Sequence, residues 1–375
     1  MGKMVRRIFK ERIVIVIIAF VLFGLFPLVL FRLIAFPKAS AELKQGVQGN
    51  LWGIVNKQKD LLTVLWEERK SHARTVSDTI QSGLLIHGDE DFVSLVNGRN
   101  EHEYLRLKMQ LECMKADYGY KGIVICDATG TIQATTDTEK SLIGMNIMKE
   151  KEFRNVHETL YDGKTYTSEV IHYSLNGAND AEGNESPSLF MSYPIKGENH
   201  DVIGAVLLWM DTSLLNNSMR NVLLGKTGEA YLVNKDGVMV TQSRFSDHMK
   251  SNGETCRGSY KVVDPDTNML TKGVKRCITE RRSGYDLEYM DYDGLKVVGA
   301  WIWLKDLNMG LIVEIDADEA LGTVHNINSM VKSLMVVIII PAFVMAILLY
   351  RKLSTGYVLR NLPLPKKALL GATSI

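Results

Sequence analysis

Residues 229–242 read EAYLVNKDGVMVTQ, which is an apolar run, a short polar turn with a glycine, and a second apolar run. Residues 121–136 read KGIVICDATGTIQATT and follow the same order. A glycine between two short runs rich in Val and Ile is typical of a β-hairpin. Two hairpins this far apart in the chain predict two separate antiparallel sheets.

The two hairpins belong to a duplicated unit. Asp127 aligns with Asn234, and Gly130 aligns with Gly237, at an offset of 107 residues in both cases. Two further apolar strands, each of which begins at Gly and ends at Asp, correspond at an offset near 105: 204–211 and 310–316. Two copies at one large offset indicate duplicated domains and not a solenoid of short repeats.

Each copy is predicted to contain five antiparallel strands with helices at their side, which is an α+β fold. The first copy has a helix near 150–161 and strands at 121–127, 131–136, 165–174, 188–195 and 202–210. The second copy has a short helix near 271–282 and strands at 229–234, 237–242, 285–291, 295–303 and 310–315.

Before the first sheet, residues 37–86 predict one long helix. Apolar residues recur there at helical spacing, and Trp52 and Trp66 share one face because 14 residues make about four turns. We prefer packing of this face against the sheets to a dimer seam. Both arrangements are compatible with different faces of one helix.

Two uncharged apolar stretches are long enough to cross a bilayer. Residues 13–31 and residues 333–350 contain no charged side chain, and at about 1.5 Å per residue each approaches the ~30 Å hydrocarbon thickness. A cleaved signal peptide is the rival interpretation of the first stretch, but the apolar run exceeds the roughly 7–15 residues of a signal core. A buried core helix is the rival for both. Residues 317–332 are predicted to be helical and to continue into the second span.

Basic residues beside the spans set the orientation. Five Lys or Arg residues lie in 1–12, before the first span, and five lie in 351–375, after the second. Such clusters are typical of the cytoplasmic side. Both termini are therefore predicted to be cytoplasmic, and the long region between the spans is predicted to lie outside.

Composition narrows the class of protein further. The 375 residues carry a net charge of +1, which argues against a nucleic-acid-binding protein. An apolar content of 46% argues against a disordered chain. The mean hydropathy of −0.01 is the average of two apolar spans and a polar outer region.

A spanning helix, a long outer helix, two PAS-like sheets and a return span together resemble the double Cache sensor domain of bacterial transmembrane receptors. Residues 224–245, LGKTGEAYLVNKDGVMVTQSRF, resemble the opening of its membrane-proximal module, and 289–304 and 309–320 resemble its last strands. The resemblance covers about residues 38–330. It implies a small-molecule ligand, usually bound in the membrane-distal sheet.

The spans and the resemblance divide the chain into seven parts. They are a cytoplasmic N-terminus 1–12, a transmembrane helix 13–36, the outer helix 37–86, a membrane-distal module 87–211, a membrane-proximal module 212–330, a second transmembrane helix 333–350 and a cytoplasmic end 351–375. Residues 361–375 resemble the first helix of a HAMP linker, which would be incomplete here.

The resemblance implies a homodimeric, two-pass receptor of the bacterial inner membrane with a periplasmic or extracellular sensor domain. A sensor histidine kinase is the first expected output, and a chemotaxis receptor or a diguanylate cyclase is the alternative. A membrane-anchored binding protein without output is a rival of another class. We find no catalytic constellation in the sequence and expect neither an enzyme nor a cofactor.

The ligand site is expected by comparison with the amino-acid-binding subset of this family. That subset has an Arg-x-Trp-Tyr helix motif, a strand Tyr and a final Asp, whereas residues 151–154 here read KEFR. The resulting candidates are Lys151, Phe153, Arg154, Tyr166, Tyr173, Tyr193, Trp209 and Asp211.

Six of these candidates have an expected role and a simpler alternative. Lys151 or Arg154 would bind a carboxylate and Asp211 an ammonium group, while Tyr166, Tyr193 and Trp209 would form an aromatic wall. The expected ligand is an amino acid, an amine or an organic acid. The alternatives are a solvated charged helix for the two cations, a helix cap for Asp211, and ordinary core or surface aromatics.

Four cysteines lie between the spans. Cys256 and Cys277 are the candidate disulfide, since an oxidising compartment permits one. Cys113 and Cys126 are expected to be buried thiols. The sequence has no CxxC motif and no close histidine spacing, so no metal site is expected.

Overall fold

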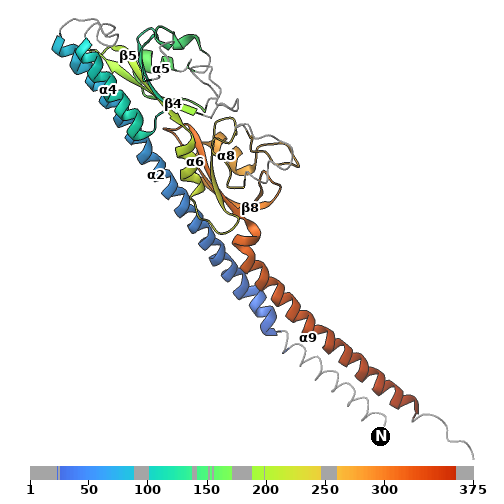
Figure 1. The fold of residues 1–375 in the computed structure, drawn as a ribbon. Coiled ribbons are helices and arrows are strands. Elements are labelled where there is room, and N and C mark those ends of the chain that lie inside the picture. Colours follow the sequence, from blue (N-terminus) through green and yellow to red (C-terminus); the bar gives the residue numbers. More distant parts are fainter. Residues whose placement is uncertain are drawn as a thin grey trace, which may run out of the picture. The chain divides into compact units, whose positions relative to one another are not determined.

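The computed structural model describes residues 23, 26–87, 101–136, 142–150, 153, 156–170, 188–197, 199–245 and 260–359. The chain forms two compact units. One is Val47–Ala320, which contains both sheets, and the other consists of Met1–Gly46 and Leu321–Ile375. Figure 1 shows the elements in sequence colours.

The predicted long helix is confirmed. Helix α2 spans Phe36–His87 and follows a π-helical segment, η1, at Phe31–Ala35. Its buried apolar side chains recur in steps of three, four or seven residues, which places them in one stripe along the helix. They are Leu51, Val55, Leu62, Trp66, Ala73, Val76 and Ile80. The stripe therefore packs inside this unit, while Leu61 and Val64 stay exposed. Helix α4, Glu101–Tyr118, follows.

The first sheet has five antiparallel strands in the order β2-β1-β5-β4-β3. They are β1 Gly122–Asp127, β2 Ile132–Thr135, β3 Tyr166–Thr167, β4 Ser188–Lys196 and β5 Val202–Asp211. The 3-10 helix η3, Ile147–Lys149, and helix α5, His157–Asp162, cover one face. Side chains of α2 pack on the other face, where Ser77 Oγ donates to the Pro194 carbonyl at 3.0 Å.

The second sheet has four strands in the order β6-β9-β8-β7 and not the predicted five. They are β6 Glu229–Val233, β7 Gly284–Met290, β8 Lys296–Leu304 and β9 Met309–Asp316. Helix α6, Ser213–Arg220, joins the modules, and α8, Lys272–Glu280, packs on this sheet.

The missing strand is the predicted segment 237–242. It pairs with β6 only through an isolated bridge between Val233 and Met239. The ladder ends because the Thr241 hydroxyl oxygen, and not a backbone carbonyl, accepts the Leu232 N–H at 2.9 Å. A side chain that satisfies a strand N–H removes the need for a continued backbone partner.

The predicted duplication is confirmed in the hairpin turns. Asp127 Oδ1 accepts the backbone N–H groups two and four residues further on, at 2.8 and 3.0 Å. Asn234 Oδ1 accepts the equivalent groups at 2.9 Å each. Gly130 and Gly237 have φ values of +81° and +77°, which suit glycine, so both turns use the same chemistry.

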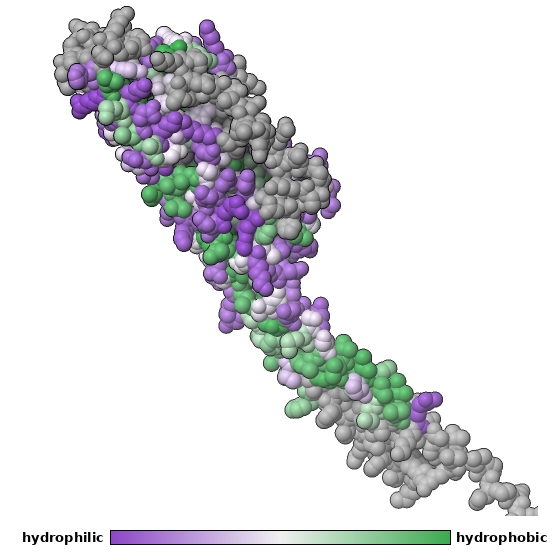
Figure 2. Space-filling view, viewed as in Figure 1, coloured by the Kyte–Doolittle hydropathy of each residue, from purple (hydrophilic) through white to green (hydrophobic). Residues whose placement is uncertain are grey.

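Helix α9, Ala317–Leu359, follows β9 directly, as predicted for residues 317–332 and the second span. Within the described ranges, one helix is long and apolar enough to cross a membrane, with 29 residues at Ala317–Met345 and a hydropathy of 2.0. Figure 2 shows apolar side chains gathered on α9. The exposed apolar residues of this helix include Val336, Val337, Ile340 and Phe343. The predicted first span, 13–31, lies mostly outside the described residues.

Candidate functional site

Aromatic side chains fill the face of the first sheet that α5 covers. Phe153 is 1% exposed and stacks on Phe190, with ring centroids 5.0 Å apart, and its ring lies 5.5 Å from that of Trp209. Phe190 and Trp209 stand opposite each other on β4 and β5. The half-buried Tyr166 flanks them, 6.4 Å from Phe190. The structure thus brings together three predicted residues, Phe153, Tyr166 and Trp209.

Tyr193 does not belong to this aromatic cluster, which corrects the predicted three-residue wall. It lies three residues after Phe190 on β4 and pairs with Val206 on β5. Successive strand side chains point to opposite faces, so a step of three places Tyr193 on the α2 side of the sheet. The sequence showed the aromatic residue but not the strand register.

An ion pair follows the aromatic cluster on the same face. The next same-face pair along β4 and β5 is Ser188 opposite Asp211. Lys121 Nζ donates to Ser188 Oγ at 2.6 Å and lies 3.4 Å from Asp211 Oδ2. The Lys121 and Asp211 side chains are 31% and 32% exposed, so a solute can reach both. Lys121 was not among the predicted site residues, although it is the first residue of the predicted strand 121–127.

Asp211 also caps a helix, which was the simpler alternative predicted for this residue. Its Oδ1 accepts the Ser213 N–H at 2.6 Å, at the first residue of α6. One carboxyl oxygen therefore caps the helix and the other faces Lys121. Lys151, Arg154 and Tyr173 lie outside the described residues.

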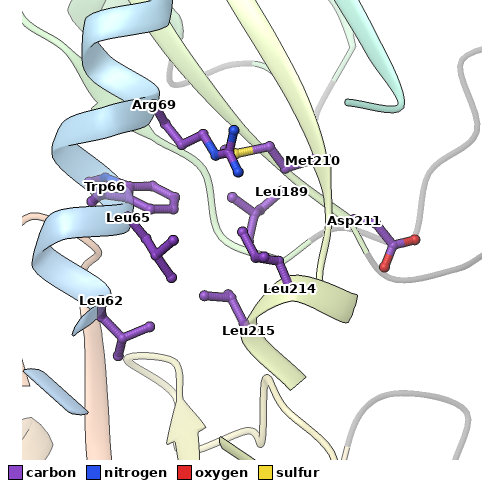
Figure 3. A pocket seen from close by; sticks show the side chains of 9 residues that line it. All are labelled: Leu62, Leu65, Trp66, Arg69, Leu189, Met210, Asp211, Leu214 and Leu215. Carbon is purple, nitrogen blue, oxygen red and sulfur yellow. The ribbon is translucent and has the colours of Figure 1, made fainter. Parts of the chain in front are cut away.

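A small cavity lies on the other face of the sheet, between α2, β4, β5 and α6 (Figure 3). Its volume is about 10 Å³, which holds at most one water molecule. Its lining is mostly apolar: Leu62, Leu65, Trp66, Arg69, Leu189, Met210, Asp211, Leu214 and Leu215. Figure 3 shows the Asp211 carboxylate directed away from the leucines. An amino acid does not fit in this space.

Arg69, at the edge of the cavity, is 6% exposed and has no acidic partner within 4.0 Å among the described residues. Its guanidinium lies 5.8 Å from the Tyr118 ring centroid and 5.1 Å from that of Tyr120. Its Nη1 also donates to the Tyr120 hydroxyl at 3.2 Å. Two aromatic faces and one hydrogen bond therefore stabilise this buried charge.

The second sheet contains a buried acidic cluster that the sequence analysis missed. Glu229 and Glu314 stand opposite each other on β6 and β9 and are 6% and 2% exposed. Tyr231 and Tyr289 donate to Glu314 at 2.8 and 2.6 Å. Glu314 and these two tyrosines make one hydrogen-bonded group on the sheet face that α8 covers.

Glu229 has its own donors. The Ser243 hydroxyl donates to Oε2 at 2.6 Å, and the Tyr292 hydroxyl donates to Oε1. Burial raises the pKa of Glu314 to about 8, with the Glu229 charge adding to the effect, and burial also raises the pKa of Glu229. A sequence signal was present, since Glu314 interrupts the apolar run GLIVEID and aligns with Trp209 of the first copy.

The predicted disulfide is not formed. Cys277 is a free, buried thiol on α8 whose Sγ packs against Gly310, and Cys256 lies outside the described residues. Cys126 is buried, as expected, but Cys113 is exposed because it lies on the outer side of α4. In the described part of the chain, no three His, Cys, Asp or Glu side chains are grouped to hold a metal ion.

These exposures predict thiol reactivity. In a Cys256→Ser background, we expect maleimide to label Cys113 within minutes and to leave Cys126 and Cys277 unlabelled until urea unfolds the chain. Burial raises the pKa of both inner thiols to about 12, so they have almost no thiolate at neutral pH. Mass spectrometry of labelled peptides measures this. Rapid native labelling of Cys277 would contradict its placement.

Known proteins share this architecture. A family profile described as Cache domain matches residues 44–324. The ligand-binding domain of the Campylobacter jejuni chemoreceptor Tlp3 in complex with L-valine is 9% identical, with a TM-score of 0.52, over 76% of this chain and 98% of that chain. The same sensory domain with isoleucine bound is 10% identical over the same shares, also with a TM-score of 0.52.

The extracellular domain of the putative histidine kinase mmHK1S-Z3 is 15% identical, with a TM-score of 0.49, over 77% of this chain and 98% of that chain. No curated protein matches the chain. At these identities, the solved structures establish the fold alone.

Proposed function

Because the chain belongs to the double Cache family of sensor domains, we propose that it is the sensory part of a membrane receptor and that it binds an amino acid with an apolar side chain. The binding site is the α5-covered face of the membrane-distal sheet. The observation that carries this proposal is the Lys121–Asp211 pair beside the aromatic cluster.

This arrangement matches the chemistry of a zwitterion. The ligand ammonium would bind Asp211, and its carboxylate would bind Lys121, so that each charge exchanges a 3.4 Å partner for a closer one. The apolar side chain would lie at the edge of the aromatic cluster nearest Trp209, next to the ion pair on the same face. The valine and isoleucine in the Tlp3 structures support this ligand class for the shared fold.

We also propose a two-pass topology with residues 13–31 and α9 in the inner membrane and the sensor domain outside. The uninterrupted step from β9 into α9 supports a signal carried inward by displacement of this helix. The output is a histidine kinase in our first proposal, and a chemotaxis or diguanylate cyclase module in the second. The receptor would act as a homodimer, and we assign no catalysis to this chain.

Calorimetric titration of the full chain in nanodiscs with valine, isoleucine and leucine tests the site. We expect Asp211→Asn and Lys121→Met each to weaken binding by about 10- to 100-fold, because each removes a charged hydrogen bond to the ligand. Asparagine keeps an oxygen for the Ser213 N–H, so the cap of α6 survives.

The matched control is a second, more exposed ion pair of the same module, Lys164 and Asp162, whose atoms lie 3.2 Å apart. Asp162→Asn and Lys164→Met should leave binding unchanged. Equal affinity in the Asp211→Asn variant and the unmodified chain would exclude the site. Binding of organic acids or amines alone would reject the zwitterion.

A further inference from the structure

The buried acidic cluster of the second sheet lies directly before α9, where a change in its charge can act on the start of that helix. Glu314 is the third residue before α9, and its partner Glu229 is the first residue of β6. Side chains opposite each other on antiparallel strands have Cβ atoms about 5 Å apart. Any repulsion between these carboxyl groups therefore acts on β9 directly before it becomes the membrane helix.

The surroundings of the cluster supply hydroxyl donors and further acids. Tyr231 and Tyr289, from β6 and β7, donate to Glu314, whereas Ser243 and Tyr292 donate to Glu229. The β8 residue opposite Glu314 is Gly299, which has no side chain to offer. The loop after β7 adds two carboxyl groups, those of Asp291 and Asp293.

The cations of neighbouring elements bind elsewhere. Lys272 and Arg276 on α8 pair with Asp286, at 2.5 and 3.6 Å. The Arg244 backbone N–H donates to Glu229 at 3.3 Å, but its guanidinium donates to the Gly228 carbonyl at 2.9 Å. Among the described residues, no cation lies within 4.0 Å of either glutamate.

Two buried negative charges without a cation are costly even when hydroxyl groups donate to them. We propose that Glu229 and Glu314 hold one proton between them, and that its loss at alkaline pH separates β6 from β9 and displaces the start of α9. The membrane-proximal module is thus a proton sensor. This second input is independent of any ligand in the membrane-distal module.

The direction of the pH effect follows from linkage. The folded chain keeps a proton on Glu314 up to about pH 8, whereas the unfolded chain releases it near the ordinary value of 4.5. The stabilisation that the proton on Glu314 gives to the folded chain is therefore complete below pH 4.5. It is lost as the pH rises from 4.5 to about 8, and it is gone above about 8. One retained proton makes the unfolding equilibrium constant rise about tenfold per pH unit within the window.

Infrared difference spectroscopy of the full chain in nanodiscs, without ligand, tests the proposal between pH 6 and 10. We expect the band of a buried protonated carboxylic acid to disappear with a midpoint near pH 8, and Glu314→Gln to lack this transition. Hydrogen exchange, corrected for its intrinsic pH dependence, should rise over β6, β9 and the first turn of α9 in the same interval.

Glu280→Gln is the control, because Glu280 is exposed at the end of α8 and should leave the transition intact. If Glu314→Gln does not fold, Tyr289→Phe replaces it. Loss of that donor destabilises the carboxylate, so the infrared midpoint should move to higher pH. The proposal would be overturned if the infrared carboxyl transition were unchanged in Glu314→Gln, or in Tyr289→Phe where that variant replaces it. It would also be overturned if the unmodified chain showed no such transition. A carboxyl transition without a change in exchange at β9 would likewise overturn it.

Discussion

We expect Trp66→Ala to lower the free energy of unfolding by about 3–5 kcal/mol, since removal of a large buried side chain costs this much when the cavity cannot collapse. Trp66 is 4% exposed on α2, and its Nε1 donates to Thr167 Oγ1 at 3.2 Å. The Thr167 hydroxyl in turn donates to the Asp306 carbonyl at 3.4 Å. Trp66 thus contacts β3 of the first sheet at the point where that strand reaches the turn between β8 and β9.

Urea unfolding of the full chain in detergent, followed by circular dichroism, measures the loss. Trp66→Phe keeps most of the apolar area and should cost about 1 kcal/mol, the usual net contribution of one hydrogen bond. Trp52→Ala is the matched control, because Trp52 lies on the same helix and is only half-buried. Equal losses for Trp52→Ala and Trp66→Ala would show that burial on α2 does not connect the modules.

Local patterns predicted the elements of this fold well. The Asp or Asn and Gly of each hairpin determine a turn through their own side-chain oxygen and positive φ, without help from distant residues. The apolar stripe of α2 likewise depends only on spacing along one helix. Such features are visible in a sequence because the interactions that produce them lie within a few residues.

Features that depend on pairing between distant residues were predicted less well. Whether Tyr193 shares a face with Trp209 depends on the register of β4 against β5. The loss of the strand at 237–242 depends on one hydroxyl that replaces a backbone acceptor. The Glu229–Glu314 pair joins residues far apart in the chain, and neither glutamate suggests burial until the other is placed opposite it.

The second large effect should come from Gly299→Ala. A Cβ at Gly299 would lie 2.0 Å from the Tyr289 hydroxyl and 3.1 Å from Cγ of Glu314. The tyrosine must move, which strains a packed core by about 1–3 kcal/mol and removes a donor from a buried carboxyl at about 1–3 kcal/mol. We expect a total loss of about 2–6 kcal/mol in urea unfolding, and a higher pH for the carboxyl transition of Glu314.

Gly122→Ala provides the matched control, because this strand glycine has room for a Cβ, with its nearest neighbour at 4.0 Å. It should be neutral or slightly stabilising, since alanine restricts the unfolded chain.

The double variant Gly299→Ala with Tyr289→Phe tests whether the loss arises from the clash between the new Cβ and the Tyr289 hydroxyl. Without the hydroxyl the closest contact is the ring carbon at 2.9 Å, so a small shift suffices. The double variant should therefore be clearly more stable than the sum of the two single losses predicts. Simple additivity would mean that Gly299 acts through the backbone of β8 and not through the Tyr289–Glu314 contact.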